Sequence, residues 1–145
     1  MLKNIESGYE LRALKIKDKS KKTKGQINLM DQNLNDLLFN FAVSVLKFLK
    51  KLPKTPEMNV IRYQLAKCST SSGANYEEAQ AGLSKADFNN KVRISLREMR
   101  ESNYWLRIFK ESLDNNKLDS DLIQLIDESI QLKKILGSIV TKTNK

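Results

Sequence analysis

The sequence FNNKVRISLREMRESNYWLRIFKESL, residues 88–113, gives the clearest indication of the fold. Apolar or small side chains recur in it at alternating spacings of four and three residues, a pattern typical of a helix packed in a bundle. These side chains are Phe88, Val92, Ser95, Met99, Ser102, Leu106, Phe109 and Leu113. The stripe therefore predicts a long helix with one face in a helical core.

Two neighbouring segments carry related patterns. A first helix is predicted from the stripe Leu34, Leu38, Phe41, Val45, Phe48 and Leu52. The next is predicted to begin at Thr55 and Pro56, because Thr suits a cap and Pro suits the first helical position. Its stretch 69–75 is small and polar. We expect this helix to continue to about Ala81, because small side chains let two helices approach closely.

The long central helix is predicted to begin at Ser84, with Asp87 completing a capping motif after Gly82. A fourth helix is predicted after a cap at Asp119 or Ser120. Its stripe is Leu122, Ile126, Ser129, Leu132, Leu136 and Val140. Four amphipathic helices with short connections predict an all-α, antiparallel up-and-down four-helix bundle.

Composition argues against catalysis. The chain has 145 residues, enough for one domain, but it contains no His and a single Cys. A di-iron site in a bundle requires His, a zinc site requires several Cys, and a catalytic triad requires an imidazole. The glycines form neither a dinucleotide fingerprint nor a phosphate loop. We therefore expect no enzyme, no catalytic residue, no metal and no cofactor, with Cys68 a small buried hydrophobe.

Charge is unevenly distributed. Lys and Arg number 26 against 17 acids, a net charge of +9, and residues 1–27 hold eight of the bases and three of the acids. We expect a basic N-terminal arm over residues 1–30 and the bundle over residues 31–145. The arm is either a solvated tail or a segment that grasps nucleic acid. Its candidate binding residues are Lys15, Lys17, Lys19, Lys21, Lys22 and Lys24.

The expected compartment is the cytoplasm. No apolar run is long enough for a membrane span, and the beginning of the sequence has no secretory signal pattern. Cys68 has no second cysteine in the chain with which to form a disulfide, which suits a reducing environment. We expect no membrane partner.

The central helix carries two further lines of side chains. About 120° from the core stripe lie Ile94, Glu98, Glu101, Trp105 and Ile108. Partial burial at the bundle edge would explain this line. We favour an oligomer interface anchored by Trp105.

The third line of the central helix is cationic. It consists of Arg93, Arg97, Arg100, Tyr104 and Arg107. Guanidinium groups spaced along a rigid helix suit phosphates, and an interleaved ring suits a base. A solvated basic face, paired with carboxylates of other helices, is the alternative.

Three segments carry a family resemblance: residues 52–57 (LPKTPE), 71–79 (SSGANYEEA) and 100–106 (RESNYWL). Through them the chain resembles the bacterial four-helix-bundle proteins encoded within intervening sequences of large-subunit ribosomal RNA genes. The arm 1–30 lies outside the resemblance. Ser72 departs from the family, which more often has an aliphatic residue there.

The resemblance implies a bundle that assembles as a ring, typically a homopentamer. It also implies a relationship to the accessory variability determinant proteins of diversity-generating retroelements, basic bundles that bind nucleic acid and a reverse transcriptase. We therefore expect a non-enzymatic, homo-oligomeric protein that binds RNA or DNA with low sequence specificity. The alternative is a protein scaffold or accessory subunit, for example of a reverse transcriptase, without direct contact to nucleic acid.

Overall fold

The computed structural model describes residues 34–82, 84–113 and 119–144, and the predicted arm 1–30 lies outside these ranges. The described residues form four α-helices and no strand. The helices are α2 (Leu34–Leu49), α3 (Pro56–Gln80), α4 (Lys85–Ser112) and α5 (Ser120–Thr143). None of these four helices is long and apolar enough to span a membrane.

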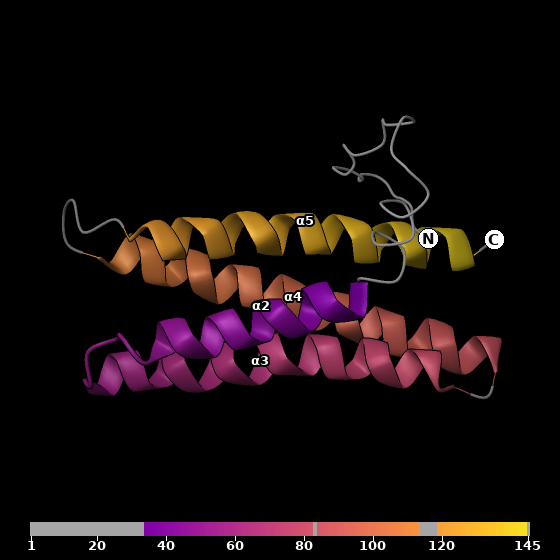
Figure 1. Ribbon diagram of the computed structural model, residues 1–145, viewed down its shortest axis with the longest axis horizontal. Coiled ribbons are helices and arrows are strands. Elements are labelled where there is room, and N and C mark those ends of the chain that lie inside the picture. Colours follow the sequence, from indigo (N-terminus) through magenta and orange to yellow (C-terminus); the bar gives the residue numbers. More distant parts are fainter. Residues whose placement is uncertain (1–33, 83, 114–118, 145) are drawn as a thin grey trace.

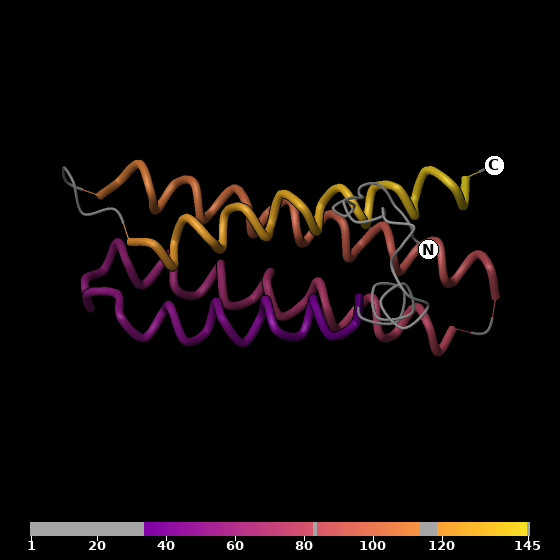
Figure 2. Tube along the Cα trace, turned by 45° about the horizontal axis from the view of Figure 1, so that its top comes forward, coloured from indigo at the N-terminus to yellow at the C-terminus, as the bar shows by residue number. Residues whose placement is uncertain are grey.

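The helices run alternately up and down along one common axis (Figure 1). Each helix packs against its neighbour in the sequence, and α5 returns to α2 and closes the bundle (Figure 2). The contact between α3 and α4 is the most extensive, and the contact between α2 and α5 is the least. The prediction of an antiparallel four-helix bundle is confirmed.

The helix starts follow the predicted caps. Thr55 Oγ1 accepts a hydrogen bond from the Met58 amide at 3.2 Å, and Pro56 occupies the first helical position. Ser84 Oγ accepts from the Asp87 amide at 3.0 Å. At α5 the cap is Asp119, whose carboxylate accepts from the Asp121 amide at 2.8 Å. Such a side chain satisfies a donor that the first turn of a helix leaves free.

The predicted stripes form the core with one adjustment. Every predicted core residue of the first helix is buried, although Leu52 lies after the end of α2. In α4 the stripe is buried from Val92 to Phe109, and its two end members, Phe88 and Leu113, are partly buried against the core. In α5, Leu125 and Ile139 are buried, whereas the predicted Ile126 and Val140 are only partly buried against the same core. The core face of α5 is therefore rotated slightly from the predicted stripe.

The small polar run lies inside the continuous helix α3, as predicted, and permits close contacts on two sides. A Cβ placed on Gly73 would lie 3.3 Å from the Cβ of Leu38, which shows how closely α2 approaches α3 there. On the other side, the hydroxyls of Ser72 and Ser95 lie 3.1 Å apart in the core between α3 and α4. The hydroxyl of Ser72 thus has a buried polar partner.

Candidate nucleic-acid interface

The predicted cationic line lies on the outer side of α4. All five members are exposed: Arg93, Arg97, Arg100, Tyr104 and Arg107. At a rise of about 1.5 Å per residue, the four guanidinium groups extend over roughly 20 Å of one rigid helix. The structure therefore brings these five predicted residues together on one surface.

None of the four arginines forms an ion pair with a described carboxylate. The ion pairs among residues 34–82, 84–113 and 119–144 involve only Lys51 and Lys110 as cations. Arg93 donates to the side-chain oxygen of Asn144, and Arg107 Nε donates to Asn103 Oδ1 at 2.9 Å. The neutral amide partners orient these side chains without cancelling their charge.

A buried polar link orients Arg107. Asn103 is buried, and its amide nitrogen donates to Ser129 Oγ of α5 at 2.9 Å. The same Asn103 side chain accepts from Arg107. The orientation of this guanidinium group is thus coupled to the packing of α4 on α5.

An aromatic pair accompanies the arginines. The ring of Tyr104 is 48% exposed and meets Trp105 edge to face, with ring centroids 5.4 Å apart. The guanidinium carbon of Arg107 lies 5.9 Å from the centroid of the Tyr104 ring, within the range of a cation–π contact. An exposed ring next to guanidinium groups is the combination that binds nucleobases and phosphates.

Lys133 of α5 joins this cationic face, and the sequence analysis missed it. Burial lowers the pKa of its amine, and the charges of Arg107, Arg100 and Lys134 lower it further. The three neighbouring cations therefore lie close enough to repel it. Periodicity within α5 could not reveal this, because the proximity depends on how α4 and α5 are aligned.

The predicted interface line is half-buried at the edge of the bundle. Ile94, Glu98, Glu101 and Trp105 are intermediate in exposure, and Ile108 is 39% exposed. Trp105 packs on the core, and its indole nitrogen donates to Glu101 at 3.3 Å. Partial burial within one chain, the alternative set out above, therefore accounts for part of this line. Ile108 leaves an apolar side chain of this line exposed to solvent.

Other predicted groups have no place in this surface. The arm residues Lys15, Lys17, Lys19, Lys21, Lys22 and Lys24 lie outside the described residues. Cys68 is buried, as expected. Burial, with smaller contributions from the nearby Glu101 and Glu98, raises the pKa of its thiol to about 11. No group of three or more His, Cys, Asp or Glu side chains in the described ranges could hold a metal ion.

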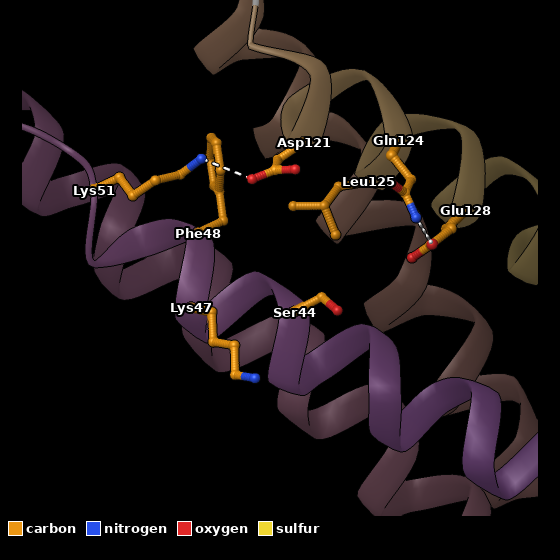
Figure 3. A pocket seen from close by; sticks show the side chains of 8 residues that line it. All are labelled: Ser44, Lys47, Phe48, Lys51, Asp121, Gln124, Leu125 and Glu128. Atoms are coloured by element: carbon orange, nitrogen blue, oxygen red, sulfur yellow. Dashed lines mark hydrogen bonds and ion pairs between the residues drawn. The ribbon is translucent and has the colours of Figure 1, made fainter.

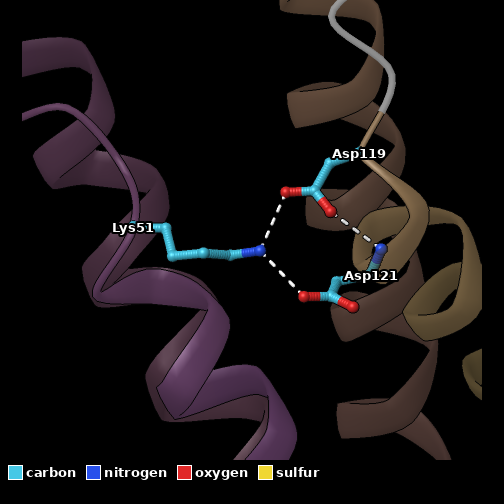
Figure 4. Close-up of polar contacts among 3 residues, drawn as sticks. All are labelled: Lys51, Asp119 and Asp121. Carbon is cyan, nitrogen blue, oxygen red and sulfur yellow. Dashed lines mark hydrogen bonds and ion pairs between the residues drawn. The ribbon is translucent and has the colours of Figure 1, made fainter.

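A separate polar hollow of about 300 Å³ lies between α2 and α5 (Figure 3). It is lined by Ser44, Lys47, Phe48, Lys51, Asp121, Gln124, Leu125 and Glu128. At one end, Lys51 Nζ lies 2.9 Å from Asp119 and 2.8 Å from Asp121 (Figure 4). This hollow contains none of the predicted site residues. Its ion pairs link the end of α2 to the start of α5, and these two helices have the smallest contact among the neighbouring pairs of the bundle.

Two comparisons with known proteins, one by sequence family and one by structure, each give a match. The family model described as 23S rRNA-intervening sequence protein matches residues 30–138. A crystal structure from Bacteroides thetaiotaomicron, described as a protein with unknown function from the S23 ribosomal protein family, is 31% identical with a TM-score of 0.66. That match covers 74% of this chain and 97% of the other. The search of curated proteins gave no match.

Proposed function

From the premise that the chain belongs to the 23S rRNA-intervening sequence protein family, we propose that it is a non-enzymatic protein that binds RNA or DNA with low sequence specificity. The proposed contact surface is the cationic face of α4 and α5. We define this face as Arg93, Arg97, Arg100, Tyr104, Arg107 and Lys133. The basic arm would add charge to the same complex.

The observation that carries the proposal is the unpaired state of the arginines within the described residues. A structural basic face would neutralise its guanidinium groups with carboxylates of neighbouring helices, whereas Arg97 and Arg100 have no hydrogen bond or ion pair to a described residue. Lys133 is held near Arg100 and Arg107 despite the repulsion. A bound polyanion would relieve this repulsion by supplying phosphate charge.

Low sequence specificity follows from the residue types on the face. Arginine and lysine side chains along a helix contact phosphates, which carry no sequence information. The one aromatic member of the face, Tyr104, can stack on any base. Affinity would therefore depend strongly on salt concentration and weakly on sequence.

We further propose that the protein acts as a homo-oligomer, with a homopentamer as the expected assembly. The support is the half-buried line on α4 that ends at the exposed Ile108. Repetition of the cationic face around a ring would multiply its potential. Light scattering tests this proposal, and Trp105→Ala should shift the wild-type oligomer toward monomers. A monomeric wild-type protein would contradict it.

Binding is tested by titrating labelled RNA and following fluorescence anisotropy at low and moderate salt. The variant Arg97→Glu with Arg100→Glu should abolish binding. The variant Lys54→Glu with Lys67→Glu changes net charge equally, at exposed positions away from the face, and should retain most of the affinity. Equal losses in the two variants would show a general charge effect and contradict the proposed face. Nuclease-resistant association with a protein, without RNA binding, would instead support a scaffold.

A further inference from the structure

We infer that the cationic face selects single-stranded nucleic acid over duplex, and that Tyr104 is the side chain on which an unpaired base stacks. This inference rests on the proposed function, because it names the form of the ligand for the same surface. The evidence is the exposed position of the Tyr104 ring and its contacts with neighbouring side chains.

The Tyr104 ring is both accessible and supported. Almost half of the residue is exposed, although its ring centroid lies only 5.4 Å from that of Trp105 at an interplanar angle of 81°. Trp105 is itself held by packing on the core and by its hydrogen bond to Glu101. An exposed ring with a fixed neighbour loses little conformational freedom when a base stacks on it.

Cations flank the ring along the helix. Arg100 lies four residues before Tyr104 and Arg107 three residues after it, so both share its side of α4. Arg107 also approaches the ring at 5.9 Å. Lys133 lies near both arginines from α5. A nucleotide whose base stacks on Tyr104 would therefore have cations available for the phosphates on either side.

This arrangement distinguishes single strands from duplexes. In a single strand, the bases are free to turn outward and stack on an aromatic side chain. In a duplex they already stack on one another, and extracting a base has an unfavourable free energy. The arginines would attract both forms, but only the single strand would gain the contact with Tyr104. The single strand should therefore bind about tenfold more tightly.

Tyr63 provides a matched control. It is the other strongly exposed tyrosine among the described residues, 64% exposed, and it lies on α3. No described ring or cation contacts it. Because Tyr63 is the more exposed of the two, removal of its ring takes away at least as much exposed aromatic surface as removal of the Tyr104 ring.

The experiment compares labelled oligouridylate alone with the same strand annealed to oligoadenylate, at fixed salt. Tyr104→Ala should weaken single-strand binding about tenfold and leave duplex binding unchanged. Tyr104→Phe should keep the single-strand affinity, and Tyr63→Ala should affect neither ligand. Trp105, the one tryptophan of the chain, gives a local readout, since its emission should change on single-strand binding and respond less in Tyr104→Ala.

Equal wild-type affinity for the two ligands would overturn the inference. It would also be overturned if Tyr104→Ala weakened both ligands equally or behaved like Tyr63→Ala. In those cases, loss of binding in Arg97→Glu with Arg100→Glu would still uphold the proposed function. Absence of wild-type binding to either ligand would overturn both.

Discussion

Ser72 of α3 and Ser95 of α4 exchange hydrogen bonds in the core. Ser72 Oγ donates to the Ser95 carbonyl at 2.9 Å, and Ser95 Oγ donates to the Ser72 carbonyl at 2.7 Å. Both side chains are fully buried. The two reciprocal bonds join the side chain of each helix to the backbone of the other, between the two most extensively packed helices.

Ser72→Ala should lower the free energy of unfolding by about 1 kcal/mol, because it removes a buried hydrogen bond. Urea denaturation measures this change. Ser44→Ala, at an exposed position of α2, should change stability by less than about 0.5 kcal/mol. Equal effects of the two substitutions would show that the Ser72 hydroxyl contributes no net stability.

The two glycines within the described helices should respond differently to substitution by alanine. No atom lies within 4 Å of a Cβ placed on Gly137, so Gly137→Ala should raise the free energy of unfolding by about 1 kcal/mol through helix propensity alone. A Cβ on Gly73 would lie 3.3 Å from Leu38 Cβ. That atom is bonded directly to the backbone of α2, so it cannot move away unless the helix moves. In Gly73→Ala the unfavourable close contact should therefore cancel the increase in the free energy of unfolding that comes from helix propensity. Thermal denaturation of both variants tests the contrast, and equal stabilisation would contradict it.

Cys68 should be unreactive in the folded protein. Burial holds the pKa of its thiol near 11, so the nucleophilic thiolate is scarce at neutral pH. Alkylation by iodoacetamide should be slow under native conditions and fast in denaturant, as followed by mass spectrometry. Rapid native alkylation would show that the α3–α4 contact opens readily.

The sequence predicted the fold well because each helix carries its own signal. The alternation of four and three residues in α4 identifies the buried side from Val92 to Phe109 without knowledge of any partner. In α5 the same reasoning erred slightly. Apolar residues lie on both sides of its stripe, and the packing of α4 and α2 decides that Leu125 and Ile139 are buried more deeply.

The candidate site was only partly predictable for a related reason. The arginine line belongs to one helix and follows from its periodicity. Lys133 belongs to the face because α5 is aligned with α4, as shown by the hydrogen bond between Asn103 and Ser129. Periodicity shows which side of a helix is buried, but it does not show which residue of a neighbouring helix lies beside a given residue.

The ion pairs of Lys51 should stabilise the bundle over a defined pH range. Lys51 holds the pKa of Asp119 below its usual value, so this stabilisation exists above about pH 4 and is lost as the pH falls further. Asp121 and Asp119 raise the pKa of Lys51, so the stabilisation is also lost above about pH 10. Between these limits, Lys51→Met should lower the free energy of unfolding by less than about 1 kcal/mol, since the pairs are exposed.

Denaturation at several pH values measures this dependence. Lys50→Met, at the neighbouring exposed lysine, serves as the control and should show no such pH profile. High salt should reduce the effect of Lys51→Met through screening. A Lys51→Met effect that persisted unchanged below about pH 3 would show that the contribution comes from contacts other than the two carboxylates, such as the Phe48 ring 5.3 Å from Nζ.

Lys133 should contribute oppositely to stability and to binding. Its amine is partly buried and repelled by Arg107 and Arg100, which lowers its pKa in the folded state. The unfolded chain then binds more protons as the pH approaches the usual lysine pKa, so this group makes stability rise with pH there. At neutral pH the charged amine is destabilising. Lys133→Met should therefore raise the free energy of unfolding slightly, because solvent screens much of the repulsion at this partly exposed position.

The same substitution should weaken RNA binding, because it removes one cation from the phosphate-binding face. The slope of log affinity against log salt should fall by about one unit. Lys142→Met, at an exposed position of the last turn of α5, should leave both properties nearly unchanged. A gain in stability with unchanged binding would remove Lys133 from the face. Loss of both would mean that the ammonium group of Lys133 stabilises the folded bundle, whereas opposite changes would show that the same charge destabilises the bundle and strengthens binding.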